Sequence, residues 1–73
     1  MKIQRLYLIE FTKEERVIMR ELGWQLSAGE LALNQSQYER MCREIKEAYR
    51  IYSDEETWKT KVIRRIYAYL LRL

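Results

Sequence analysis

The residues that could carry acid–base or metal chemistry are two groups of carboxylates and one thiol. Glu14 and Glu15 are adjacent, and positions 54–56 are all acidic. Histidine is absent, and Cys42 is the only cysteine. A zinc site needs several cysteine or histidine ligands, and catalytic acid–base pairs need two carboxyl groups held in one cleft. Each carboxylate group has a simpler interpretation, because it lies where we expect the first turn of a helix, which favours negative charge.

Other signs of catalysis are also missing from the sequence. Gly23 and Gly29 lack the spacing of a phosphate-binding loop, and neither is directly followed by a Lys-Ser or Lys-Thr pair. Cys42 lies within a helical pattern, where a small buried thiol is the simplest interpretation. We therefore predict that the chain is not an enzyme and that it holds no metal and no cofactor.

Charge is distributed unevenly along the chain. Residues 57–73 contain five basic residues and no acidic one, whereas residues 1–56 contain nine basic and eleven acidic residues. On a helical wheel, spacings of three and four residues bring four of the basic side chains to one face. Such a face either lies free in solvent or meets phosphates or an acidic partner. We call it the basic stripe, and it consists of Lys61, Arg64, Arg65 and Arg72.

Apolar residues cover well over half of the circumference of this same segment. Either the last helix is the central element of the fold, packed on more than one side, or part of its apolar surface is left for a partner. Ile63, Tyr67 and Leu71, which repeat every four residues, are the candidates for the exposed part. We predict that they form an interaction strip, which binds another protein or a second copy of the chain.

The first half of the chain predicts a strand and a helix. Apolar side chains alternate with more polar ones over residues 3–10, which is typical of a strand. Thr12 and Glu15 have the spacing of a capping box, so a helix should follow over residues 13–25. Gly23 can end this helix early, because glycine adopts the left-handed conformation of a helix C-terminus.

The second half predicts a short strand and two helices. Residues 27–30 resemble a turn, and residues 31–33 are too few for a helix, so a strand there should pair with the first. Two further capping-box patterns, Ser36 with Glu39 and Ser53 with Glu56, predict helices over residues 36–52 and 54–72.

These elements define one small α+β domain, mainly helical, in which three helices pack on a two-stranded sheet in the order β-α-β-α-α. We expect a single domain over residues 1–73, because a chain of this length has room for one core only. The predicted core consists of Tyr7, Ile9, Leu22, Met41, Ile45, Tyr49, Trp58, Val62, Ile66 and Tyr69.

A strand followed by two helices, in a chain with a basic balance, resembles the ribbon-helix-helix repressors. That resemblance covers roughly the first fifty residues and implies dimerisation through paired strands that read the major groove. The outward strand face would present Lys2 and Gln4 to base edges. The sequence departs from the family at the second strand, residues 31–33, and at the third helix, so we assign the chain to no family.

The sequence favours a non-catalytic binding module that docks on a larger protein to inhibit or regulate it. A protein that handles nucleic acid is one candidate for this partner. Small phage and mobile-element inhibitors, such as anti-CRISPR and transcription-modulating proteins, offer an analogy. The alternatives are a nucleic-acid-binding regulator that uses the basic stripe and a structural homo-oligomer. No apolar run is long enough to cross a bilayer, so we expect no membrane partner. The single cysteine suits the reducing cytoplasm.

Overall fold

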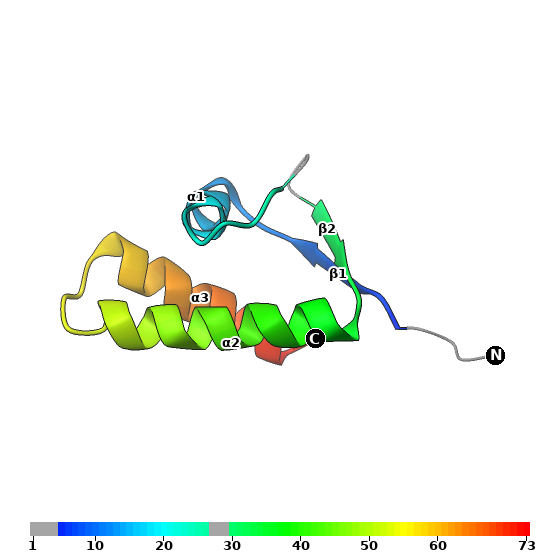
Figure 1. Cartoon of the computed structure of the whole chain (residues 1–73). Helices are drawn as coiled ribbons and strands as arrows, with labels where there is room; N and C mark the ends of the chain where they lie inside the picture. Colours follow the sequence, from blue (N-terminus) through cyan, green and yellow to red (C-terminus); the bar gives the residue numbers. More distant parts are fainter. Residues whose placement is uncertain (1–4, 27–29) are drawn as a thin grey trace.

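The computed structural model describes residues 5–26 and 30–73 of the chain and has the expected mainly helical α+β architecture. Three helices and a two-stranded antiparallel sheet follow one another in the predicted order β-α-β-α-α (Figure 1). Their bounds are β1 Tyr7–Glu10, α1 Lys13–Glu21, β2 Glu30–Leu33, α2 Gln35–Tyr52 and α3 Trp58–Leu71.

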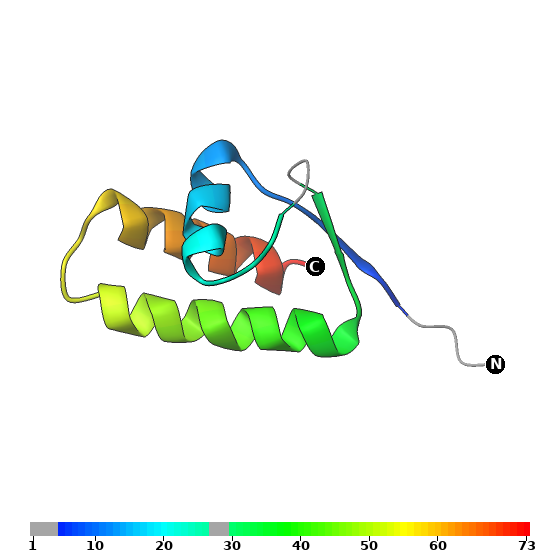
Figure 2. The same ribbon diagram turned by 45° about the horizontal axis from the view of Figure 1, so that its top comes forward.

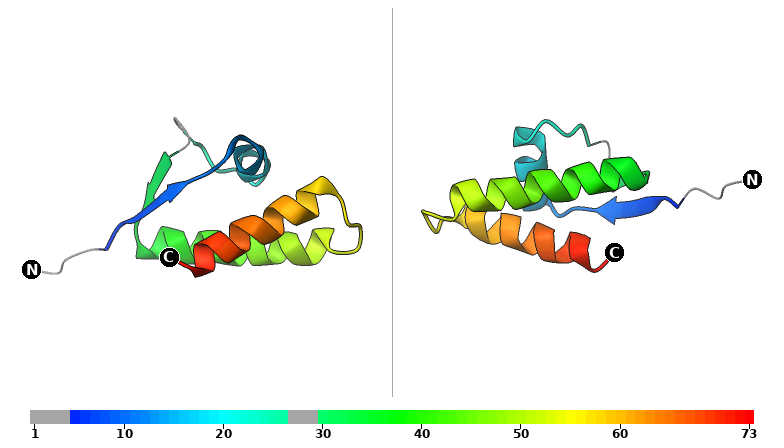
Figure 3. Two further views of the ribbon diagram at one scale, coloured as in Figure 1. Left: turned by 180° about the vertical axis from the view of Figure 1, so that it is seen from behind. Right: turned by 60° about the horizontal axis from the view of Figure 1, so that its bottom comes forward.

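Helices α2 and α3 form a long antiparallel hairpin, and the remaining elements cover one side of it. The sheet lies over the end of the hairpin where α2 begins, and α1 crosses above α3 (Figure 2). Seen from the opposite side, α2 and α3 run side by side with β1 behind them (Figure 3). We call the end under the sheet the sheet end. The far end is the hairpin tip, residues 51–58, which includes the turn between α2 and α3.

The sheet is short, and its register places alternate side chains in the core. Tyr7 pairs with Leu33 and Ile9 with Leu31, so the buried side chains of the two strands meet on one face. Leu8 points to the opposite, exposed face. The predicted strand over residues 31–33 is confirmed with one more residue at its start. The first strand begins four residues later than predicted, and positions 3 and 4 lie outside the described residues.

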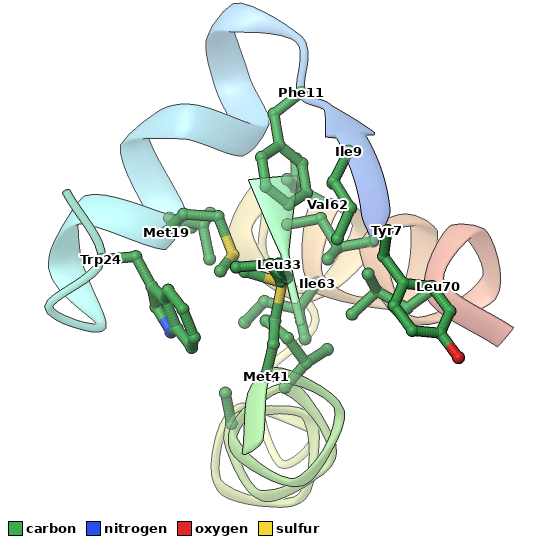
Figure 4. Close-up of a cluster of buried hydrophobic side chains, with 14 residues drawn as sticks. Tyr7, Ile9, Phe11, Met19, Trp24, Leu33, Met41, Val62, Ile63 and Leu70 are labelled. Carbon is green, nitrogen blue, oxygen red and sulfur yellow. The ribbon is translucent and has the colours of Figure 1, made fainter. Parts of the chain in front are cut away.

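The core lies between the hairpin, α1 and the inner face of the sheet, as Figure 4 shows. Six of the predicted core residues are buried: Tyr7, Ile9, Met41, Ile45, Val62 and Ile66. Leu22, Tyr49 and Tyr69 are partly buried and pack against this core. The prediction is wrong for Trp58, whose side chain is 51% exposed. Trp58 is the first residue of α3 and lies at the hairpin tip, away from the sheet.

One predicted capping box is confirmed, and a second is displaced by two residues. The Thr12 hydroxyl accepts the amide of Glu15, and the Glu15 carboxylate accepts the amide of Thr12, at 3.3 and 2.7 Å. At the start of α2 the box is formed by Asn34 and Gln37 instead of Ser36 and Glu39. Asn34 directly follows β2 and is among the best N-caps, so the helix begins as soon as the strand ends.

The third predicted capping box is absent, and α3 begins four residues later than expected. Ser53 ends α2 instead, with its hydroxyl donating to the carbonyl of Arg50 at 3.0 Å. The acidic residues 54–56 therefore lie in the turn between the helices and not in the first turn of α3. Helix α1 also ends early, at Glu21, because Gly23 adopts a positive φ of 94°.

Candidate binding surfaces

The predicted interaction strip does not exist as one surface. Ile63 is completely buried, with 0% exposure, so its assignment to a partner surface is wrong. The physical reason is that α3 packs against both α1 and α2 and is the central helix of the fold. Tyr67 is partly buried against the core, and only Leu71, at 62% exposure, lies free at the C-terminal end of α3.

The basic stripe is exposed as predicted, but the fold supplies acidic partners to half of it. Arg65 lies 3.6 Å from a carboxylate oxygen of Glu14 and 3.5 Å from one of Glu15, both in the first turn of α1. Arg64 lies 3.5 Å from a carboxylate oxygen of Glu56. Within residues 5–26 and 30–73, the two other members of the stripe, Lys61 and Arg72, form no ion pair.

The uncovered side of the hairpin carries a broader basic surface than the stripe alone. A shallow hollow of about 600 Å³ is lined by Arg43, Lys46 and Arg50 of α2, together with Glu47, Tyr49 and Ser53. The Arg64 guanidinium lies 5.8 Å from the centre of the Tyr49 ring, which links the stripe to this hollow. We call the lining of this hollow and the basic stripe together the basic face, and its basic residues are Arg43, Lys46, Arg50, Lys61, Arg64, Arg65 and Arg72.

The hairpin tip gathers three large apolar side chains on the surface of the molecule. Ile51 is 63% exposed, Tyr52 is 38% exposed and Trp58 is 51% exposed. Isolated exposed apolar residues are normal, but three large ones within eight residues make this segment a candidate interaction site. Sequence reasoning misses this surface. The available signal is that Ile51 lies outside the apolar sector of α2.

Two hollows lie at the tip, and both are lined by Ile51 and Tyr52. One has a volume of about 290 Å³ and is lined by these two residues with Leu22, Glu44, Glu47 and Ala48. The other has a volume of about 430 Å³ and is lined by the same pair with Asp54, Glu55, Thr57 and Lys59. We call the two hollows together the tip groove.

The turn at the tip is held in place by one buried hydroxyl. The Thr60 side chain is almost completely buried, and its Oγ1 lies 2.9 Å from the carbonyl oxygen of Tyr52 and 2.8 Å from that of Glu55. The Lys59 ammonium lies 3.1 Å from a Glu21 carboxylate oxygen and ties the start of α3 to the end of α1. The exposed apolar cluster is therefore presented on a fixed turn.

The sheet end is closed by an aromatic stack. The Tyr7 and Tyr38 rings lie parallel with their centres 4.0 Å apart, and the Arg5 guanidinium lies 4.7 Å from the centre of the Tyr7 ring. The Tyr38 hydroxyl donates to the carbonyl of Leu70. Burial, followed by the neighbouring Cys42 thiol, raises the pKa of Tyr38 above its usual value. A phenol is protonated at neutral pH, so Tyr38 acts here as a hydrogen-bond donor, which is a structural role.

Other functional signatures are limited. Among residues 5–26 and 30–73, no three acidic, cysteine or histidine side chains gather as a metal site would require. In the same part of the chain, no helix combines the length and apolar character needed to cross a membrane.

The first strand pairs with β2 of its own chain, which differs from the strand pairing between subunits of ribbon-helix-helix proteins. Searches of protein-family models, curated proteins and solved structures find no match to this chain.

Proposed function

We propose that this chain is a non-catalytic binding module that docks on a larger protein, through the hairpin tip, to inhibit or regulate it. The observation that carries the proposal is the cluster of Ile51, Tyr52 and Trp58 on the surface of the tip. Tryptophan and tyrosine are the side chains that contribute most to binding energy at protein interfaces. The analogy with small phage and mobile-element inhibitors agrees with this mode of action, since such proteins act by occupying a surface.

The geometry of the tip supports docking in a second way. A surface that is already ordered loses little conformational entropy on binding, so more of its contact energy appears as affinity. Thr60 and the Lys59–Glu21 ion pair fix the turn that carries the cluster. The tip also projects from the far end of the hairpin, away from the sheet (Figure 2). A large partner can therefore reach it without contacting β1 or β2.

Affinity capture with matched variants tests this proposal. The immobilised chain is exposed to a lysate of its own cells with and without nuclease, and bound proteins are quantified. Trp58→Ala should weaken capture of a specific partner by about 2 kcal/mol, or roughly thirtyfold, as is typical for an interfacial tryptophan. Leu71→Ala is the control, because Leu71 is similarly exposed but lies at the other end of α3. A partner that is lost with Leu71→Ala and kept with Trp58→Ala would contradict the proposal.

A second candidate function is direct binding of nucleic acid by the basic face. Its supporting observation is that four basic residues of this face form no ion pair among the described residues: Arg43, Lys46, Lys61 and Arg72. Four phosphate contacts would make the logarithm of the affinity for duplex DNA fall with the logarithm of salt with a slope of about −3.6. Lys61→Gln should reduce that slope by about 1. An affinity that does not change with salt would exclude this candidate.

A further inference from the structure

We propose that the tip groove binds a positively charged amphipathic helix of the partner protein. This inference rests on the proposed function and adds the chemical class of the bound segment. It follows from two properties of the groove, which are an apolar floor with helical spacing and an excess of negative charge along the rim.

The floor of the groove is apolar and follows one side of α2. Ala48 and Ile51 are three residues apart on this helix, and Leu22 faces them from the end of α1. Ala48 is buried, and its small side chain leaves the hollow between Leu22 and Ile51. A groove between two helices, lined by small and aliphatic side chains, suits the apolar face of a third helix.

The length of the groove sets the size of the segment that fits. The lining residues of α2 run from Glu44 to Tyr52, and the groove continues along the turn to Thr57. These nine residues are separated by eight steps of about 1.5 Å, so this part of the helix spans about 12 Å. A partner helix of roughly two to three turns would therefore lie along the floor and reach the tip.

The rim of the groove carries four carboxylates and one ammonium group: Glu44, Glu47, Asp54, Glu55 and Lys59. The ammonium is already paired with Glu21. Asp54 and Glu55 are exposed and form no ion pair with the described residues. Glu44 and Glu47 have neighbouring arginines, Arg40 at 3.9 Å and Arg50 at 2.9 Å. The charge left unbalanced is therefore negative and lies nearest the turn.

Charge complementarity selects the sign of the partner segment. Like charges placed opposite each other at an interface cost free energy, whereas opposite charges steer association and fix orientation. The other side of α2 has the reverse character, because Arg43, Lys46 and Arg50 line its hollow. An acidic segment would be directed to that basic face, and a basic amphipathic helix to the tip groove. The basic residues of the partner should flank its apolar stripe and meet Asp54 and Glu55.

The test uses two synthetic peptides of about 14 residues, long enough to span the groove. Both carry leucine at positions i, i+3, i+4 and i+7, and the remaining positions are lysine in one peptide and glutamate in the other. Binding to the full chain is measured by fluorescence anisotropy at low salt. The lysine peptide should bind, and Ile51→Ser should weaken its binding about tenfold or more, because the complex loses the burial of a large aliphatic side chain.

Charge-matched variants separate the rim from the floor. Asp54→Asn combined with Glu55→Gln should weaken binding of the lysine peptide about threefold to fivefold, because two exposed ion pairs with the peptide are lost. This effect should vanish at high salt, which screens exposed charges. The control double variant, Glu10→Gln with Glu39→Gln, removes two exposed carboxylates elsewhere and should change binding less than twofold. Leu71→Ser serves as the equivalent control for Ile51→Ser.

Three positive results would overturn the inference, and so would a failure of both peptides to bind. The first is binding of the lysine peptide that does not depend on Ile51, and the second is binding of the glutamate peptide at a site that does. The third is a dimer, detected by sedimentation velocity, that disappears with Ile51→Ser, because a second copy would then occupy the groove. If neither peptide binds while Trp58→Ala still abolishes partner capture, the inference fails and the proposed function stands. If the lysine peptide binds through Ile51 but Trp58→Ala leaves partner capture unchanged, the groove binds a basic helix and the proposed docking through Trp58 fails.

Discussion

The two ends of the α2–α3 hairpin contain similar apolar residues, but most of these are buried at one end and several are exposed at the other. At the sheet end, β1, β2 and the stack of Tyr7 on Tyr38 cover most apolar side chains of both helices, although Leu71 stays exposed. At the tip, Ile51 and Trp58 remain exposed although they belong to the same two helices. The difference arises because α1 ends at Glu21 and reaches the hairpin only as far as Lys59. Ile51 and Trp58, which lie near that contact, are therefore covered only in part and stay more than half exposed.

Polar contacts differ between the ends in the same way. The sheet end uses hydrogen bonds that join separate elements, such as the Tyr69 hydroxyl, which accepts the amide of Glu10 at 3.1 Å. The tip uses hydrogen bonds within a short segment, made by Thr60 to the turn before it, and an exposed ion pair, between Lys59 and Glu21. The sheet end thus combines hydrogen bonds between elements with a packed core, whereas polar contacts hold the turn at the tip. An exposed surface that keeps its shape is what a docking site requires.

The largest expected difference is between two isoleucines in these contrasting environments. Ile63 is completely buried, so Ile63→Ala should cost about 2 to 5 kcal/mol of unfolding free energy, because a cavity remains. Ile51 is exposed, so Ile51→Ala should change the unfolding free energy by less than about 0.5 kcal/mol. Urea denaturation followed by circular dichroism measures both. If Ile63→Ala fails to fold, Ile63→Val should still lose about 0.5 to 1.5 kcal/mol. Equal losses at the two positions would contradict the contrast.

Thr60 provides the next largest effect and tests whether the tip depends on one hydroxyl. Thr60→Val removes the donor to the carbonyls of Tyr52 and Glu55 but keeps the side-chain shape. The Glu55 carbonyl then loses this donor, whereas the Tyr52 carbonyl still accepts the Glu55 amide, so the change should cost about 1 to 2 kcal/mol, read as a lower midpoint in thermal melting. Thr57→Val is the control, because the Thr57 side chain makes no capping hydrogen bond and is exposed. A similar loss in both variants would show that the tip is held in another way.

Local signals in the sequence predict most of the fold. The alternation that buries Tyr7 and Ile9 and the capping box of Thr12 depend on a few neighbouring residues, and both are confirmed. The environment of α3 is different. Its apolar residues cover more than half of the helix, so a helical wheel cannot decide which part α1 and α2 cover. The packing of α1 and α2 on α3 buries Ile63 and leaves Trp58 exposed, and both outcomes differ from the predictions.

The candidate surfaces show the same limit. The basic residues of α3 are found from their spacing, but the carboxylates of Glu14 and Glu15 that pair with Arg65 come from α1. The tip groove joins Leu22 to Ile51, two residues from different helices. No local pattern contains such a contact, because it depends on where α1 ends relative to α2. Reasoning from one sequence therefore finds the charged and apolar side chains but not the surfaces that they form together.

A smaller effect concerns the cap that joins the sheet end to α2. Asn34→Ala removes the side chain that accepts the amide of Gln37 at 2.8 Å, and it should cost about 0.5 to 2 kcal/mol. Ser36→Ala should stay within about 0.5 kcal/mol, because Ser36 is exposed inside the first turn. Thermal melting of the two variants compares them directly. If Ser36→Ala proved to be the more harmful change, α2 would begin at the capping box that the sequence pattern predicts.

The smallest effect is a dependence on pH at the sheet end. Tyr38→Phe removes the hydroxyl that donates to the Leu70 carbonyl, so at neutral pH it should cost about 0.5 to 1.5 kcal/mol. Burial and the Cys42 thiol raise the pKa of Tyr38 in the folded chain above the usual value of 10.0, while Arg5 acts in the opposite direction.

The sign of the pH effect follows from that shift. The unfolded chain loses the Tyr38 proton first, so the advantage of wild type over Tyr38→Phe is complete below pH 10.0 and is lost as the pH rises through the folded pKa. Urea denaturation of both chains from neutral to alkaline pH measures this difference. An advantage that stays constant across this range would mean that the phenol is as free to ionise in the fold as in the unfolded chain. In that case the aromatic stack would be an open surface like the tip, and the contrast between the two ends of the hairpin would not hold.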